Sequence, residues 1–217
     1  MMEIVRIGKV LISPRSVIQE KLQQKSIASL VFILSLLSAI FAVISLTVFD
    51  GEYISKILGE DSTDANLLKA YKIFMLLGSG IVAFFTPVII TIINTLFNYL
   101  VLWLFRTKIS FRELFIIGLY SYVPLIIDLV MRIIIQSITH KPLFQSPARI
   151  FFFLSEENGF IYRTLSYLTI FTIWSIYIYI SGIYVVSPEN KKKKAATIII
   201  ITNILFLLIS GFFSKTV

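Results

Sequence analysis

The chain has 217 residues, of which 57% are hydrophobic, with a formal net charge of +8 and a mean hydropathy of +0.89. So much apolar surface cannot be hidden inside a water-soluble globule of this size, which predicts an integral membrane protein. The sequence has no cysteine and one histidine, which excludes disulfides, thiolate metal sites and histidine clusters, so no metal or other cofactor is expected.

The first 25 residues are predicted to form a cytoplasmic amphipathic segment. Ser13 followed by Pro14 is typical of a helix start, with a capping serine and a proline in the first turn. Beyond this start, apolar residues recur on one helix face among polar neighbours, namely Val17, Ile18 and Leu22. We expect this helix to lie on the membrane surface.

Residues 26–217 are predicted to form one transmembrane domain, because apolar stretches of about 20 residues recur along it. These stretches lie near residues 26–48, 73–104, 113–138, 160–186 and 195–213. The second stretch is too long for one upright span and too short for two. We therefore expect one long helix that is tilted and bent at Pro87 or that projects into the cytoplasm. The predicted fold class is an all-α bundle of five transmembrane helices, preceded by the short interfacial helix.

Basic residues gather before the first predicted span, between the second and third, and between the fourth and fifth. By the positive-inside rule, the N-terminus is cytoplasmic and the C-terminus lies outside. The run from Lys191 to Lys194 is a topology signal, and its four lysines also favour contact with anionic lipid headgroups. We expect the basic residues to serve topology and lipid contact, and expect no nucleic-acid partner.

The third predicted span carries Asp128 and Arg132, two opposite charges four residues apart in an apolar helix. Residues at this spacing share one helix face, so they can form an internal ion pair that offsets the cost of placing charge in lipid. Intramembrane charge also often marks a functional site, and Asp128, near the middle of the span, is then the residue with a specific role.

The second predicted span carries a polar stripe on one helix face, and its members are Thr91, Asn94, Thr95 and Asn98. Such residues can form hydrogen bonds between helices, or they can line a path for a solute or ion. After the third span, the loop from 141 to 159 contains the apolar run 150–154, which is too short to cross the bilayer, and we expect it to dip into the outer interface.

Sequence motifs of common enzyme classes are missing, including zinc-protease, serine-hydrolase and nucleotide-binding patterns, so no catalytic residue is predicted. The strings SFREL at residues 110–114 and YSYVP at residues 120–124 resemble the Yip1 domain family. The resemblance also includes the segment around Pro14, Trp174 followed by Gly182, and the Lys194-Ala195 junction, which look like the prokaryotic branch of that family.

The Yip1 resemblance implies a five-helix membrane domain with a cytoplasmic N-terminus, here in the plasma membrane of a prokaryote. Eukaryotic members bind Rab-type GTPases in vesicle traffic, but this chain lacks their aspartate-leucine-tyrosine-glycine-proline motif, so Rab binding is not expected. Some prokaryotic members accompany ABC-type export systems.

Two functional hypotheses follow from the sequence. The first is a non-enzymatic scaffold or accessory subunit for a membrane transport or trafficking system, which binds a membrane protein partner or forms a homo-oligomer within the bilayer. The second is a small permease or channel with a polar path lined by Asn94, Asn98, Asp128 and Arg132.

Overall fold

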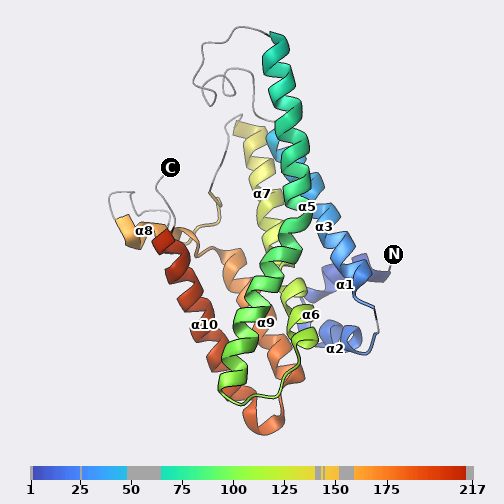
Figure 1. Ribbon diagram of the computed structural model, residues 1–217, viewed down its shortest axis with the longest axis vertical. Helices are drawn as coiled ribbons and strands as arrows, with labels where there is room; N and C mark the ends of the chain where they lie inside the picture. The colour runs from blue at the N-terminus through green and yellow to red at the C-terminus, as the bar shows by residue number, and fades with distance from the viewer. Residues whose placement is uncertain are drawn as a thin grey trace.

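The computed structural model describes residues 2–24, 26–47, 65–139, 143, 145–151 and 159–213, which form a bundle of helices (Figure 1). The helices in chain order are α1 (Met2–Val10), α2 (Pro14–Leu22), α3 (Ala28–Leu46), α5 (Ala65–Leu104), α6 (Phe111–Ser121), α7 (Val123–Thr139), α8 (Gly159–Ser166), α9 (Ile170–Val186), the 3-10 helix η2 (Glu189–Lys191) and α10 (Lys192–Phe213).

In the described part of the chain, four helical stretches are long and apolar enough to cross a membrane: Ala28–Leu46, Asn66–Leu104, Phe111–Thr139 and Glu189–Phe212. Helix α9 is also apolar but has 17 residues, about 25 Å at 1.5 Å per residue, against a hydrocarbon core of roughly 30 Å. The protein is therefore an all-helical membrane bundle with four clear candidate spans, and the predicted fifth span depends on α9.

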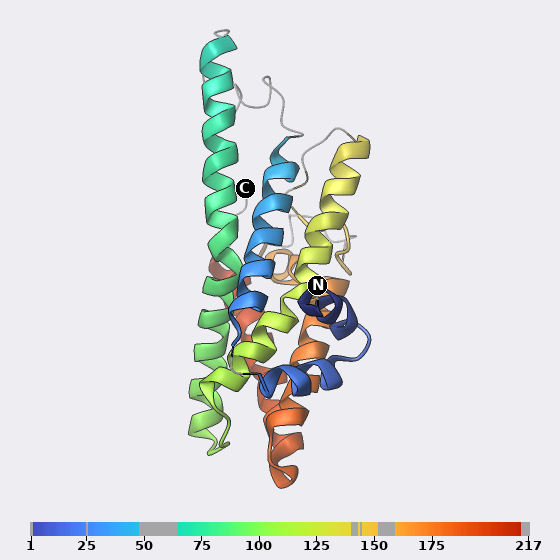
Figure 2. The same cartoon turned by 90° about the vertical axis from the view of Figure 1, so that its right-hand side faces the viewer.

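Helix α5 is one continuous helix of 40 residues that runs nearly the full height of the molecule (Figures 1 and 2). It contains Pro87, which has no N–H to donate to the carbonyl of Ala83 one turn earlier. The hydroxyl of Thr86 donates to the carbonyl of Val82 at 2.8 Å at the same place. The side of α5 that faces away from the bundle is lined by exposed large apolar residues, as suits a helix surrounded by lipid.

The third predicted span, residues 113–138, begins cleanly but breaks in the middle. Ser110 caps α6 in a capping box with Glu113, whose carboxylate accepts from the Ser110 backbone at 2.8 Å. The break between α6 and α7 is at Tyr122, just before Pro124, which cannot donate to the carbonyl of Tyr120. The proline thus divides one span into two segments.

The prediction of a single helix over residues 160–186, the fourth predicted span, was wrong, because the structure divides these residues between α8 and α9. Thr169 caps the start of α9 by accepting from the Thr172 backbone at 3.0 Å, and it pairs with Arg149 as an isolated β-bridge. Helix α8 instead lies beside the end of α10, where Gly211 leaves no room for a side chain against Thr164. The cap and the bridge end α8 before it can continue into α9.

The N-terminal segment contains two helices that pack onto the bundle, so the predicted helix on the membrane surface is not confirmed. Helix α2 contacts α6 and α9, and α1 packs against α2 (Figure 2). Val10, Val17 and Ile18 are fully buried there, and Ile18 lies close to Gly182 of α9, where an added Cβ would be 3.0 Å from the Ile18 side chain. The apolar face found in the sequence is buried by protein rather than by lipid.

Candidate functional site

The ion pair within α7 forms between the side chains of Arg132 and Asp128, with 3.2 Å between Nη2 and Oδ2. Asp128 is buried, and its other carboxylate oxygen accepts a hydrogen bond from the hydroxyl of Ser146. Ser146 belongs to the segment that follows α7 and returns toward the middle of that helix. Asp128 thus ties this segment to α7 while it pairs with Arg132.

A second polar residue of α7 holds the same region together. The side-chain oxygen of Gln136 accepts from Ser45 of α3 at 2.9 Å, and its nitrogen donates to the carbonyl of Leu143 at 3.4 Å. Farther along the returning segment, Tyr162 of α8 donates to Gln145 at 3.1 Å. The sequence placed an apolar run at 150–154 in the outer interface, but residues 152–158 lie outside the described residues.

The polar stripe of α5 faces α6, α9 and α10. Asn98 donates to Asn94 and accepts from Thr202 of α10 at 2.7 Å, so the stripe joins two helices by hydrogen bonds. Thr91 and Thr95 are buried against Gly118 of α6, where an added Cβ would be 2.8 Å from the Thr91 methyl group. The glycine therefore permits the close approach of α5 and α6.

A small cleft of about 50 Å³ opens beside this stripe, between α5, α6, α7, α9 and α10. Its polar lining is neutral and comprises Thr91, Asn94, Ser121, Tyr122, Ser175, Tyr179 and Asn203. We call this feature the mid-bundle cleft. In the described part of the chain no charged side chain lines it, so it is suited to hydrogen bonding of a neutral group and not to holding an ion.

The four residues proposed for a polar path form two separate pairs. Asn94 and Asn98 lie beside the mid-bundle cleft, whereas Asp128 and Arg132 do not line it and instead hold the segment after α7. Among the described residues, the hydrogen bonds and ion pairs of the two groups do not connect them. The structure thus shows two polar clusters where the sequence suggested one path.

The lysine run lies at one end of the bundle, beside the end of α5. Lys191 donates to the backbone carbonyl of Arg106 at 2.8 Å, and Lys194 donates to that of Phe105 at 3.2 Å. Lys192 forms an ion pair with Glu189. Two of the four lysines therefore satisfy carbonyls just past the end of α5, where Arg106 adopts a positive φ of 55°. Their contact with lipid headgroups stays a prediction.

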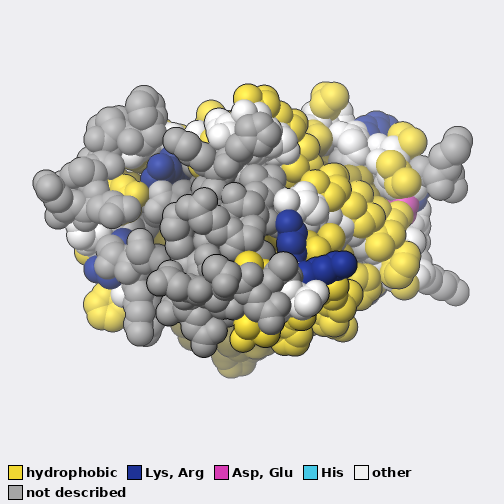
Figure 3. All heavy atoms as spheres, turned by 90° about the horizontal axis from the view of Figure 1, so that it is seen from above, with side chains coloured by type: hydrophobic (Ala, Val, Ile, Leu, Met, Phe, Trp, Pro, Cys, Tyr) yellow, Lys and Arg dark blue, Asp and Glu magenta, His cyan; other side chains and the backbone are white. Residues whose placement is uncertain are grey.

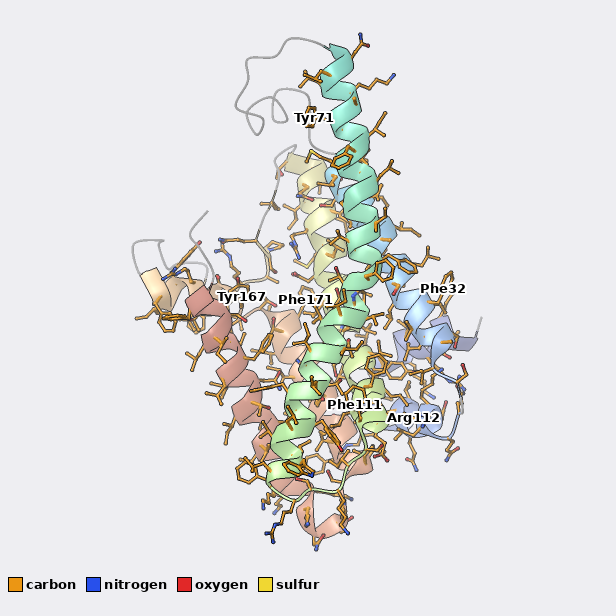
Figure 4. All side chains as sticks on the ribbon, viewed as in Figure 1. Phe32, Tyr71, Phe111, Arg112, Tyr167 and Phe171 are labelled. Atoms are coloured by element: carbon orange, nitrogen blue, oxygen red, sulfur yellow. The ribbon has the colours of Figure 1, made fainter. Side chains whose placement is uncertain are left out.

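We call this end of the molecule the basic end; it contains Arg106, Lys108 and Lys191–Lys194. Phe111, the first residue of α6, lies above this end against Tyr99 of α5, and Arg112 donates to the carbonyl of Gln24 just past α2 (Figure 4). Seen from the opposite end, where α5 begins, the described surface is largely hydrophobic with a few basic side chains (Figure 3).

The sequence did not reveal a buried charge cluster between the N-terminal helices and α6. Lys21 is fully buried and its ammonium lies 3.1 Å from the carboxylate of Glu3, which also accepts from the hydroxyl of Tyr120 at 3.1 Å. Arg6 lies 3.4 Å from the same carboxylate. Lys21 and Glu3 are 18 positions apart, so no local spacing in the sequence relates them. The sequence could have pointed to this cluster only through Tyr120, because a hydroxyl in an apolar helix needs a hydrogen-bond partner.

No metal site is formed in the described residues, where no group of three histidine, aspartate or glutamate side chains could hold an ion. A family model described as Yip1 domain matches residues 8–213, nearly the whole chain. No curated protein and no solved structure matches the chain.

Proposed function

The chain belongs to the Yip1 domain family of membrane proteins, and from that premise we propose that it is a non-enzymatic scaffold or accessory subunit that binds another membrane protein. The observation that carries this proposal is that polar groups inside the bundle are used to hold its own helices together. Asp128 binds Arg132 and Ser146, and Asn98 binds Asn94 and Thr202.

The same contacts weigh against a permease or channel. A polar path needs Asn94, Asn98, Asp128 and Arg132 on one continuous surface, but they belong to two clusters. The mid-bundle cleft is a local space of about 50 Å³, and neither Asp128 nor Arg132 lines it. A space of this size supports local hydrogen bonding rather than solute passage.

The outer surface of the bundle offers what a scaffold needs. Helix α5 exposes apolar residues along nearly its whole length, and α10 does so along the half that leads to its C-terminal end. Helix association in lipid depends on close packing and interhelical hydrogen bonds, so long helices with accessible polar groups between them can receive a partner helix. We propose that the protein has this scaffold role within a membrane transport or trafficking system.

Orientation is part of the proposal. The contacts of Lys191 and Lys194 with the end of α5 bring two basic connections to the same end of the bundle. Because basic connections face the cytoplasm, the basic end is proposed to be cytoplasmic, with the N-terminus on that side and the C-terminus outside, in the plasma membrane of a prokaryote. Exposed lysines there, such as Lys193, are proposed to contact anionic headgroups.

The experiment is extraction of the tagged chain from its native membrane into lipid nanodiscs, followed by quantitative mass spectrometry. An unrelated multi-pass protein with the same tag is the control. We expect one membrane protein to accompany the chain in comparable molar amount and to be absent from the control. No such protein, together with solute or ion flux through liposomes containing the purified chain, would contradict the scaffold and favour the permease.

A further inference from the structure

The mid-bundle cleft lies where α5 and α10 separate. The two helices meet at the basic end and diverge above it, with α9 between them (Figure 1). Asn94 of α5 and Asn203 of α10 stand on the two sides of this opening, and Ser175 and Tyr179 of α9 form its back. The opening is lined by hydrogen-bonding groups in a part of the molecule whose outer surface is apolar.

Two of these groups have unused hydrogen-bonding capacity in the described part of the chain. Tyr179 is 4% exposed, and its hydroxyl faces Asn98 without a hydrogen bond of normal geometry. The side-chain nitrogen of Asn203 donates to the carbonyl of Ile199 in its own helix at 2.8 Å, so its side-chain oxygen remains to accept from a ligand. A buried phenol without a well-formed hydrogen bond is costly, so a polar group in the cleft that bonds to it would be favoured.

The depth of the cleft decides which molecules can supply that occupant. Asn94 lies ten residues before the end of α5 at Leu104, and Asn203 lies eleven residues after the start of α10 at Lys192. At 1.5 Å per residue both are about 15 Å from the basic end, which is half of the roughly 30 Å hydrocarbon core. Lipid headgroups stay at the membrane surface, whereas a transmembrane helix can carry a polar side chain to this depth.

We propose that the mid-bundle cleft receives a neutral polar side chain, a carboxamide or a hydroxyl, carried at the midpoint of a transmembrane helix of a different protein. This inference rests on the proposed scaffold function and names the chemistry of its partner. The neutral lining disfavours an ionised side chain, because nothing in the cleft would compensate the buried charge. The volume of about 50 Å³ leaves space for a small polar group.

Next to the polar rim of the cleft, the exposed positions of this chain carry isoleucine rather than a carboxamide or a hydroxyl. Of the residues next to Asn94 and Asn203 in sequence, Ile93 on α5 and Ile204 on α10 are about half exposed, whereas Thr95 and Thr202 are buried. A symmetric pair that joined through this face would therefore present isoleucines to both clefts. The partner is a different chain with an asparagine, glutamine, serine or threonine at the matching depth.

The test uses the purified full-length chain in bilayers with a synthetic transmembrane helix as the probe. The probe is a leucine-alanine helix of about 24 residues with one asparagine at its midpoint. Association is measured by energy transfer from a dye on the probe to a dye on a tag of the protein, with probe self-association measured separately. The comparison probes have leucine at the midpoint, or asparagine one turn from the end.

We expect the midpoint-asparagine probe to associate about three- to thirtyfold more strongly than the leucine probe, the range of one interhelical hydrogen bond. Tyr179→Phe and Asn203→Leu should each remove most of that difference, and Tyr179→Phe preserves the volume of the side chain. Thr197→Leu, a change at an exposed position of α10 outside the cleft, should leave it intact.

Equal association of the midpoint-asparagine and leucine probes would overturn the inference, as would association that Tyr179→Phe and Asn203→Leu do not weaken. Energy transfer between two labelled copies of the protein that Asn203→Leu abolishes would also overturn it, because the occupant would then be a second copy. If the probes show no preference but a native partner still accompanies the chain in nanodiscs, the cleft assignment fails while the scaffold function stands.

Discussion

The substitution Lys21→Met tests how firmly the N-terminal helices are attached to the bundle. Lys21 is fully buried, and its ammonium is 3.1 Å from the carboxylate of Glu3. Breaking a buried ion pair from one side costs about 3 to 5 kcal/mol, because the remaining charge stays buried without compensation. Arg6 still lies 3.4 Å from Glu3, so we take the lower end, about 3 kcal/mol.

A loss of about 3 kcal/mol corresponds to about a hundredfold rise in the population in which α1 and α2 have left the bundle. Cleavage of these helices by a nonspecific protease follows that population when opening is fast, so the rate of cleavage in nanodiscs should rise by a similar factor. Trp174 provides a second readout, because its indole donates to the carbonyl of Leu11 at 3.3 Å. In a Trp103→Phe background its emission should shift on release.

Two controls separate the charge from the shape of the side chain. Adding Glu3→Gln to Lys21→Met removes the buried carboxylate that has lost Lys21, so most of the protection should return. Lys9→Met changes only an exposed pair with Glu20 at 4.0 Å, and should alter cleavage by less than about threefold. A Lys21→Met protein cleaved within threefold of the unmodified rate, or a double variant as labile as the single one, would refute the reasoning.

Further predictions concern packing and the polar clusters, and each is checked by thermal unfolding in nanodiscs. Gly182→Val should destabilise the protein by about 1 to 3 kcal/mol, because an added Cβ would lie 2.7 Å from a side chain of α6. Gly8 has open space around it, so Gly8→Ala should not destabilise the protein. Equal effects of the two substitutions would contradict the close packing at Gly182. Thr202→Val should lower the free energy of unfolding by about 0.6 to 2 kcal/mol, because it removes the hydrogen bond to Asn98 of α5. Thr197→Val should lower it little. A larger effect of Thr197→Val than of Thr202→Val would contradict a stabilising role of this hydrogen bond. Asp128→Asn should destabilise by about 1 to 2 kcal/mol, because it leaves a partly exposed arginine unpaired, and an unchanged midpoint would show that the ion pair contributes nothing.

The features that the sequence predicted well depend on local spacing. Asp128 and Arg132 are four residues apart on one helix, so their contact follows from helix geometry alone. The polar stripe of α5 follows in the same way, although the sequence could not say that Thr202 of α10 would meet it. Helix α5 was expected from its continuous apolar character, which Pro87 does not interrupt.

The features that the sequence missed depend on contacts between distant residues. The burial of Lys21 requires Glu3 and Tyr120 to meet it, and these residues lie on three different helices. The division of the fourth predicted span depends on the bridge between Thr169 and Arg149, which are 20 positions apart. An apolar stretch predicts that a segment is buried, but it does not say whether lipid or protein buries it.

The most direct test of the scaffold function is the mass of the intact particle, measured by native mass spectrometry after release from nanodiscs. The chain alone has a mass of 24.8 kDa. We expect a particle whose mass equals this chain plus a whole number of copies of a different polypeptide, with the same composition in repeated preparations. A mass of one chain, or of a simple multiple of this chain, would contradict the proposed function.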